Sequence, residues 1–241
     1  MGMPITVEIL DVTAVDAAFD DIFDYFTYVD ETFSVFKTTS EITKINNGDL
    51  LPKAYSEDMR TILRLCEETR QQTNGYFNVI TPSGSYNPSG VVKGWAIDHA
   101  AKMLAGMGYN DYYVEAGGDI QVRREDVHIS PWRIGIRNPF NIQETVGVLG
   151  LKNEGVATSG TYIRGQHIYN PFRPHDELRE ISSITVVGPN IYDADRFATA
   201  AFAMQQEGIM FIENIEGFEG YSIDSQGIAT KTSGFNRYVT T

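Results

Sequence analysis

The spacing of apolar residues changes near Met107, and this change limits the folds that the chain can adopt. Before it, apolar side chains recur every three or four residues, as on one face of a helix. After it, most segments are short β-branched or aromatic runs separated by Gly, Pro or Asn, which is typical of strands. Helices and strands do not alternate regularly, so the order favours an α+β fold over a doubly wound parallel sheet.

Four helices and seven strands are predicted, forming mixed or antiparallel sheets packed with helices. Helices are expected at residues 15–33 after an N-cap at Thr13, from the cap Ser56 onward with Met59, Ile62, Leu63 and Cys66 buried, at 93–107 with Gly108 as C-cap, and at 193–204. Strands are expected at 112–115, 120–123, 132–137, 146–151 and 184–187, and near Tyr221 and Ile228. The loop 74–90 is rich in Gly and Pro, and loops of this kind are often functional.

Charge and composition exclude several classes of protein. The 241 residues hold 19 Lys and Arg against 32 Asp and Glu, a formal charge of −13, which disfavours binding to nucleic acid or to an anionic membrane surface. The single cysteine excludes an internal disulfide and any cysteine-based metal site. No apolar run approaches the roughly 20 residues that span a bilayer. Without a linker or an internal repeat, we predict one domain over residues 1–241.

Five segments of the chain form an ordered set of motifs. They are Ser34-Val-Phe36 with Ser40-Glu41-Ile42 and Asn46; residues 75–82, Gly-Tyr-Phe-Asn-Val-Ile-Thr-Pro; residues 89–98, Ser-Gly-Val-Val-Lys-Gly-Trp-Ala-Ile-Asp; residues 116–120, Ala-Gly-Gly-Asp-Ile; and Ala157-Thr158-Ser159-Gly160, His167-Ile168, Asp195 and Thr199. In this order and spacing they resemble the FAD:protein FMN transferase family, the ApbE-like flavin transferases. The resemblance covers nearly the whole chain and begins at Met1-Gly2.

The resemblance implies a magnesium-dependent transferase with a single-domain ApbE-like fold. Such an enzyme cleaves FAD, attaches FMN through a phosphoester bond to a threonine of a target protein, and releases AMP. The resemblance assigns Mg²⁺ to Gly90, through its backbone carbonyl, and to Asp195 and Thr199. Residues four apart on a helix share one face, so Asp195 and Thr199 can direct two oxygens at the same hard cation.

The resemblance also assigns the flavin contacts and the catalytic groups. The flavin contacts are Met1, Phe36, Tyr76, Phe77, Asn78, Asn87, Lys93 and Ile168. The catalytic residues are Asp195, which holds the metal, and His167, whose neutral imidazole can take the threonine proton. The implied partners are FAD and an acceptor protein of the kind found in flavin-carrying redox complexes.

Three asparagines depart from the family's pattern, which usually has Asp at positions 78, 87 and 170. Neutral side chains there reduce both the repulsion of an anionic substrate and the affinity for a metal. Two alternatives to FMN transfer therefore stay open. One is an FAD pyrophosphatase that yields FMN and AMP, and the other is a flavin-binding or carrier protein with weakened catalysis.

The start of the sequence has no charged segment, apolar core and small-residue cleavage site of the kind found in a signal peptide. We therefore expect a cytoplasmic protein. A chain whose leader had been removed would have the same start and would act outside the cytoplasm.

Overall fold

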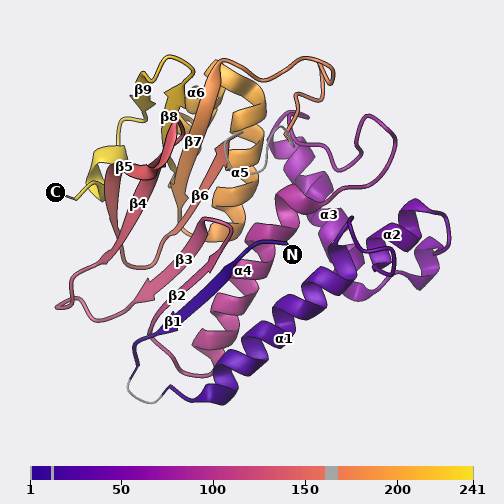
Figure 1. Ribbon diagram of the computed structural model, residues 1–241, viewed down its shortest axis with the longest axis horizontal. Coiled ribbons are helices and arrows are strands. Elements are labelled where there is room, and N and C mark those ends of the chain that lie inside the picture. The colour runs from indigo at the N-terminus through magenta and orange to yellow at the C-terminus, as the bar shows by residue number, and fades with distance from the viewer. Residues whose placement is uncertain (1, 12–13, 161–167, 241) are drawn as a thin grey trace.

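A computed structural model describes residues 2–11, 14–160 and 168–240 (Figure 1). The strands are β1 (Ile5–Ile9), β2 (Asp111–Ala116), β3 (Asp119–Arg124), β4 (Trp132–Asn138), β5 (Asn141–Leu151), β6 (Gly155–Gly160), β7 (Ile181–Gly188), β8 (Glu219–Asp224) and β9 (Ala229–Lys231). The α-helices are α1 (Asp16–Phe33), α2 (Glu41–Asn46), α3 (Glu57–Gln72), α4 (Ser89–Gly106), α5 (Ile191–Met204) and α6 (Gly208–Glu213). Short 3₁₀ turns lie at Pro52–Ala54, Gln205–Glu207 and Phe235–Tyr238.

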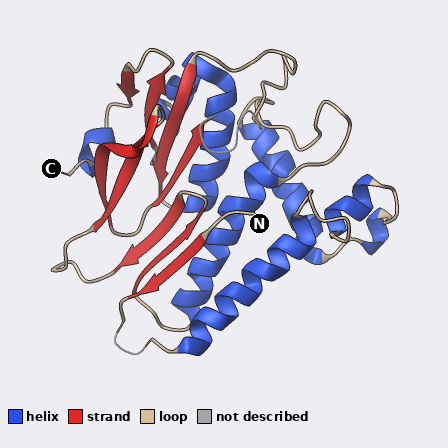
Figure 2. Ribbon diagram, in the orientation of Figure 1, coloured by secondary structure: helices blue, strands red, loops and turns tan. Residues whose placement is uncertain are grey.

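Seven of these strands form one antiparallel sheet in the order β1-β2-β3-β6-β7-β8-β9, and β4 and β5 form a separate hairpin (Figure 2). The ladder between β3 and β6 is short, with pairs only at Ile120–Val156 and Gln121–Gly155. Antiparallel sheets with helices confirm the predicted α+β class.

Helices cover one face of the large sheet. α4 packs on β2 and β3, α5 packs on β6 and β7, and the first turns of α4 contact α5 (Figure 1). α1 lies on the outer side of α4. The main core fills this layer with apolar side chains such as Ile97, Leu104, Val114 and Phe202, all of which are almost completely buried.

The β4–β5 hairpin covers part of the opposite face of the sheet. Its residues Ile134, Ile136 and Leu149 form a second core with Ile120 and Val122 of β3. Successive residues of a strand point to opposite faces. Even-numbered β3 residues therefore face the hairpin, and Asp119 and Gln121 face the helices.

Most predicted elements are present, with differences at their ends. Ser56 caps α3 through a hydrogen bond from the Met59 N–H, and Cys66 is fully buried, as predicted. Leu63 is only partly buried, and Val15, expected on the apolar face of the first helix, is 56% exposed. The predicted cap Thr13 lies outside the described residues.

α4 begins at Ser89, four residues before the predicted start. Its first six residues, Ser-Gly-Val-Val-Lys-Gly, combine glycine with β-branched side chains, which are weak helix formers. Packing against α5 keeps this segment helical, and local propensity gives no sign of that contact. β1, α2, α6 and β6 were also absent from the predicted elements.

Candidate functional site

One pocket on the helical side of the sheet gathers most of the motif residues. It is lined by Tyr76, Phe77, Asn78, Thr81, Asn87, Ser89, Gly90, Lys93, Gly117, Thr158, Ser159, Gly160, Ile168, Tyr169, Pro171, Asp195 and Thr199. They come from the loop before α4, the first turns of α4, the β2–β3 turn, the end of β6, the segment before β7, and α5. Four of the five motif segments therefore meet at one place.

Glycines let α4 and α5 approach closely beside this pocket. A Cβ atom at Gly94 would lie 2.7 Å from Asp195 Cβ and 2.9 Å from the carbonyl oxygen of Ile191. A Cβ at Gly90 would lie 3.1 Å from Thr199 Cγ2. Larger residues at these two positions would push the helices apart, so the glycines set the distance between the two halves of the site.

The Gly94 N–H places Asp195, a predicted metal ligand, beside the turn of α4 that contains Gly90, another predicted ligand. In a regular α-helix this N–H is the donor for the carbonyl of Gly90, four residues earlier. Here it donates to Asp195 Oδ2 at 2.8 Å. The Asp195 carboxylate is therefore held beside the first turn of α4, where the Gly90 carbonyl lies, and Thr199 follows one turn later on α5.

A partly buried cation lies between two buried carboxylates at the centre of the site. Lys93 Nζ forms ion pairs with Asp119 and, at 3.0 Å, with Asp195 Oδ1. Asp119 also accepts a hydrogen bond from the Thr158 N–H at 3.0 Å, and its side chain is 1% exposed. One positive and two negative charges leave this cluster with a formal charge of −1.

The donor set at the α4–α5 contact fits a hard divalent cation. It offers one carboxylate, one hydroxyl and one backbone carbonyl, all oxygen ligands of the kind that Mg²⁺ takes together with substrate phosphates. Within the described ranges no group of three or more His, Cys, Asp or Glu side chains could hold a metal by itself. A metal held here would therefore depend on oxygens supplied by a ligand.

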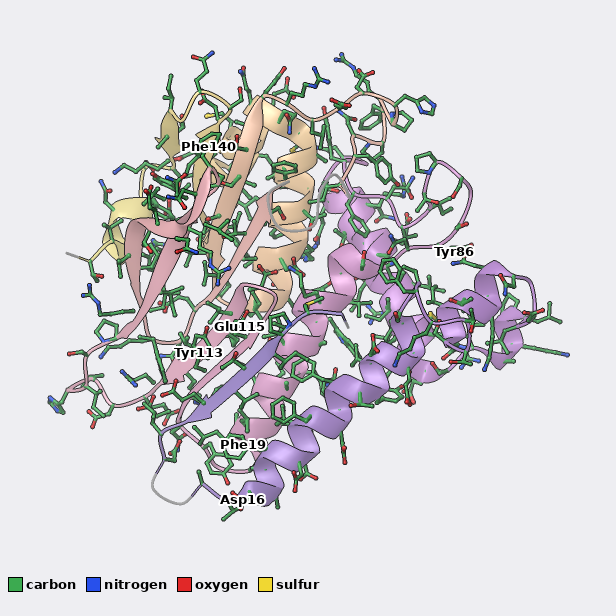
Figure 3. The ribbon with its side chains drawn as sticks, viewed as in Figure 1. Asp16, Phe19, Tyr86, Tyr113, Glu115 and Phe140 are labelled. Atoms are coloured by element: carbon green, nitrogen blue, oxygen red, sulfur yellow. The ribbon has the colours of Figure 1, made fainter. Side chains whose placement is uncertain are left out.

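The loop before α4 is fixed by amide side chains. Asn46 Nδ2 donates to the Tyr86 carbonyl at 2.9 Å, and Asn46 Oδ1 accepts from the Tyr86 N–H at 2.7 Å. Figure 3 labels Tyr86 at this edge of the molecule. Asn46 thus ties α2 to the loop that supplies much of the pocket lining.

The three asparagines that depart from the family's pattern share one local geometry. The Oδ1 atoms of Asn78, Asn87 and Asn170 each accept the N–H two residues further on, at 2.9, 3.2 and 2.9 Å. An aspartate can form the same turn. Asn78 and Asn87 line the pocket, whereas Asn170 is not among the lining residues.

The structure does not place every predicted site residue in the pocket. Lys93, Gly90, Asp195 and Thr199 line it together with Tyr76, Phe77, Asn78, Asn87 and Ile168. Phe36 does not line it and is 93% exposed in the connection between α1 and α2. Met1 and His167 lie outside the described residues, so their predicted roles stay predictions.

Three features of the site were not assigned a role from the sequence. Gly94 is part of a quoted motif, but its close contact with Asp195 depends on the packing of two helices distant in sequence. The pairing of Asp119 with Lys93 joins β3 to α4. Thr158 and Ser159 enter the lining because β6 lies next to the β2–β3 turn. All of these residues belong to the quoted motif segments, which indicated that they matter, but a motif does not specify which residues contact each other.

This fold and pocket define an α+β protein with a pocket at a helix–helix contact, in which a partly buried lysine and hard oxygen donors converge. The chain belongs to the ApbE family, whose model matches residues 1–86 and 81–221. Similar proteins include the FAD:protein FMN transferases of Haemophilus influenzae, 29% identical over 157 residues, and of Escherichia coli strain K12, 27% identical over 179 residues.

These alignments cover 60% and 70% of this chain but only 45% and 50% of the two relatives, so the chain spans about half of their length. Solved structures match more completely. The flavin transferase ApbE from Vibrio cholerae has a TM-score of 0.83 at 20% identity, over 99% of this chain and 96% of that one. The apbe protein from Thermotoga maritima gives the same TM-score and coverage at 19% identity. These structures establish the fold.

Proposed function

We propose that this chain is a magnesium-dependent FAD:protein FMN transferase. It would cleave FAD, transfer FMN to a threonine hydroxyl of an acceptor protein, and release AMP. The observation that supports this most is the convergence of Gly90, Lys93, Asp195 and Thr199 on one pocket, together with the loop and strand residues that the resemblance assigns to flavin binding. The relatives that bear this activity's name add support.

The residues have separate tasks in this proposal. Asp195, Thr199 and the Gly90 carbonyl would hold Mg²⁺, which when bound supplies positive charge to the FAD diphosphate and to the leaving AMP. α4 begins at Ser89, and Ser89 and Gly90 line the pocket, so the positive end of the helix dipole favours a phosphate there. Lys93 adds a partly buried positive charge, and Asp119 holds its ammonium group in position.

The transfer step replaces the phosphoanhydride bond of FAD with a phosphoester bond to threonine. The threonine oxygen forms a bond to the FMN phosphorus while the bond from that phosphorus to the bridging oxygen of AMP breaks. The hydroxyl proton goes to a general base, which the resemblance assigns to His167, and AMP leaves with the bridging oxygen. With water in place of threonine, the same site would act as an FAD pyrophosphatase.

One incubation tests the proposal. The protein is mixed with FAD, Mg²⁺ and a flavin-carrying redox subunit, and the products are separated. Fluorescent flavin bound covalently to the acceptor supports transfer, and free FMN with AMP supports hydrolysis. If neither product forms, the result favours a flavin carrier and contradicts the proposal.

The Asp195→Asn variant tests the metal site in the same assay. It removes the only carboxylate assigned to Mg²⁺ but keeps the shape of the side chain and one oxygen. We expect FMN transfer to fall by a factor of about 10² or more, as when a charge-stabilising group is lost from a catalytic site. Circular dichroism should show an intact fold. Near-normal transfer would place the metal elsewhere.

The acceptor would be recognised outside the pocket, because FAD itself occupies the inner site in this proposal. We also propose that the protein acts in the cytoplasm, or outside it if the natural chain carries a leader. Fractionation of the native host with an antibody to this chain distinguishes the two.

Among the described helices, none is long and apolar enough to cross a membrane.

A further inference from the structure

A second cleft lies beside the pocket, between the β4–β5 hairpin and the β2–β3 strands. Its cavity volume is about 350 Å³. It is lined by Tyr113, Glu115, Gly117, Gly118, Ile120, Arg133, Ile134, Gly135, Arg137, Ile142, Thr145 and Thr158. Figure 3 labels Tyr113 and Glu115, both on β2. No residue assigned to the flavin or to the metal lines this cleft.

The two cavities lie on opposite faces of the sheet and meet at its end. Tyr113, Glu115 and Ile120 point to the hairpin side, whereas Asp119 points to the helical side and contacts Lys93. The cavities share Gly117 and Thr158 in their linings. The two-residue turn Gly117-Gly118 borders the cleft, and its first glycine also lines the pocket. A chain lying in the cleft could pass a side chain around this turn into the pocket.

The cleft carries positive charge in a strongly acidic protein. Arg133, Gly135 and Arg137 alternate along β4 with the buried Ile134 and Ile136, so the two arginines share the exposed face of the strand. Their two charges against that of Glu115 give the lining a formal charge of +1, in a chain of −13. The lining therefore favours a negatively charged ligand, although the molecule as a whole repels one.

The remaining groups of the cleft suit a polypeptide. Glu115 accepts the Gly118 N–H at 2.6 Å, which fixes the turn. Tyr113 lines the cleft with a hydroxyl that is neutral near pH 7, and burial raises its pKa further, to about 12. The Thr145 side chain packs over Gly135 between the arginines, and Ile142 adds apolar surface. Charged, hydrogen-bonding and apolar groups from β2, β4 and β5 thus meet in one cleft, and an extended peptide offers partners for all three kinds.

We propose that this cleft binds the acceptor protein, through an extended acidic segment next to the threonine that receives FMN. The inference rests on the proposed transferase function and names the chemistry of its second substrate. Arg133 and Arg137 are four residues apart on a strand, so their Cα atoms are separated by about 13 Å. Two carboxylates with the same spacing in an extended acceptor segment would face the two arginines.

The spacing favours a peptide over a second part of FAD. The two phosphates of FAD share a bridging oxygen and form one compact anionic centre, which the Mg²⁺ ligands and Lys93 already serve in the pocket. A pair of arginines separated by four strand residues matches two distinct negative groups. FAD binding in the cleft is nevertheless an outcome that the experiment can detect.

The experiment uses two dye-labelled synthetic peptides and fluorescence anisotropy. One peptide has a threonine and two aspartates four residues apart, and the other has lysines in place of the aspartates. The titrations contain FAD but no Mg²⁺, so binding is measured without turnover. Arg133→Glu/Arg137→Glu is compared with Arg60→Glu/Arg64→Glu on α3, across the molecule from β4 in Figure 1. The control variant has the same change in net charge, so long-range repulsion is equal in both.

We expect the acidic peptide to bind the wild-type protein at least about tenfold more tightly than the basic one. The β4 variant should reverse this preference, and the α3 variant should retain it. FAD affinity, followed by flavin fluorescence, should be the same in the two variants. Absence of acidic-peptide binding, or equal loss in both variants, would overturn the inference. Selective loss of FAD affinity in the β4 variant would assign the cleft to FAD and overturn it as well.

Adding Mg²⁺ to the wild-type protein then tests the proposed function separately. If no AMP forms while the acidic peptide still binds in the cleft, the transferase and pyrophosphatase functions fail and the binding site remains. If AMP forms but the acidic peptide does not bind, the function stands and the acceptor site lies elsewhere.

Discussion

At the scale of single residues, the ammonium group of Lys93 lies beside Asp195, the carboxylate that would bind a divalent cation. Its ammonium group contacts both Asp119 and Asp195, and Asp195 is the only carboxylate among the proposed metal ligands. Lysine and metal therefore compete for one carboxylate. Asp119, buried and held by the Thr158 N–H, draws the ammonium away from Asp195 and eases this competition.

We predict that Lys93→Met raises the affinity for Mg²⁺ in the absence of FAD. Removing the internal cation leaves two adjacent buried carboxylates uncompensated, and a tenfold gain in affinity corresponds to about 1.4 kcal/mol. FAD affinity should fall, because the pocket loses its positive side chain. Isothermal titration with Mg²⁺ and with FAD measures both effects. Lys102→Met, an exposed lysine on the same helix, is the matched control. Unchanged Mg²⁺ affinity in Lys93→Met would show that the metal does not use Asp195.

Cys66 gives a second prediction at this scale. It is fully buried in α3, and burial raises the pKa of its thiol to about 12. The thiolate is the reactive form, so the folded protein should not react with a thiol reagent at pH 8 and should react on unfolding in urea. Because the folded pKa is raised, the stability contribution of this group is complete below the unfolded pKa of about 8.5. It decreases as the pH rises toward 12. Rapid labelling of the native protein would contradict this burial.

At the scale of secondary-structure elements, the β2–β3 turn determines how the two cavities meet. Ala116 pairs with Asp119, which leaves Gly117 and Gly118 as the two central residues, with φ of 61° and 96°. Positive φ at both positions is the requirement of a type I′ hairpin turn, for which Asn-Gly is a favoured sequence. The turn needs glycine at its second position more than at its first.

From this turn geometry we predict that two glycine substitutions change the free energy of unfolding by different amounts. Gly117→Asn should leave the free energy of unfolding near that of the wild type, since asparagine tolerates the left-handed region. Gly118→Ala should lower it by about 1 kcal/mol or more. A Cβ at Gly118 meets nothing within 4 Å, so this cost comes from the backbone alone. Urea denaturation of both variants measures the difference. Equal stabilities would mean that the turn relaxes to another type.

At the scale of the whole molecule, charge would oppose the proposed binding of FAD. The chain has a formal charge of −13, and the Lys93 cluster has −1. Because FAD is an anion, its approach would be slowed by repulsion that salt can screen, with a Debye length of about 10 Å at 0.1 M ionic strength. We predict that, without Mg²⁺, the association rate of FAD rises with ionic strength. Stopped-flow flavin fluorescence measures the rate, and neutral riboflavin is the control. A rate that falls with salt would reveal local attraction that outweighs the net charge.

The sequence by itself determined the class of fold and the identity of most site residues. Helical spacing in α1 and α3 and alternation in β2 and β4 reflect burial of one face, and this pattern is visible in the order of residues along the chain. The order of the motifs was sufficient to select Lys93, Asp195, Thr199 and the loop residues that now line one pocket.

The tertiary structure alone decided which of these residues touch. The early start of α4 depends on close packing of Gly90 and Gly94 against α5, and weak local helix propensity conceals it. The bond between Gly94 and Asp195 spans 101 residues, and the pair of Lys93 with Asp119 joins a helix to a strand. The cleft under β4 forms because a hairpin folds back over the sheet. Such contacts depend on three-dimensional packing between segments that are distant in sequence, so the spacing of residues along the chain cannot predict them.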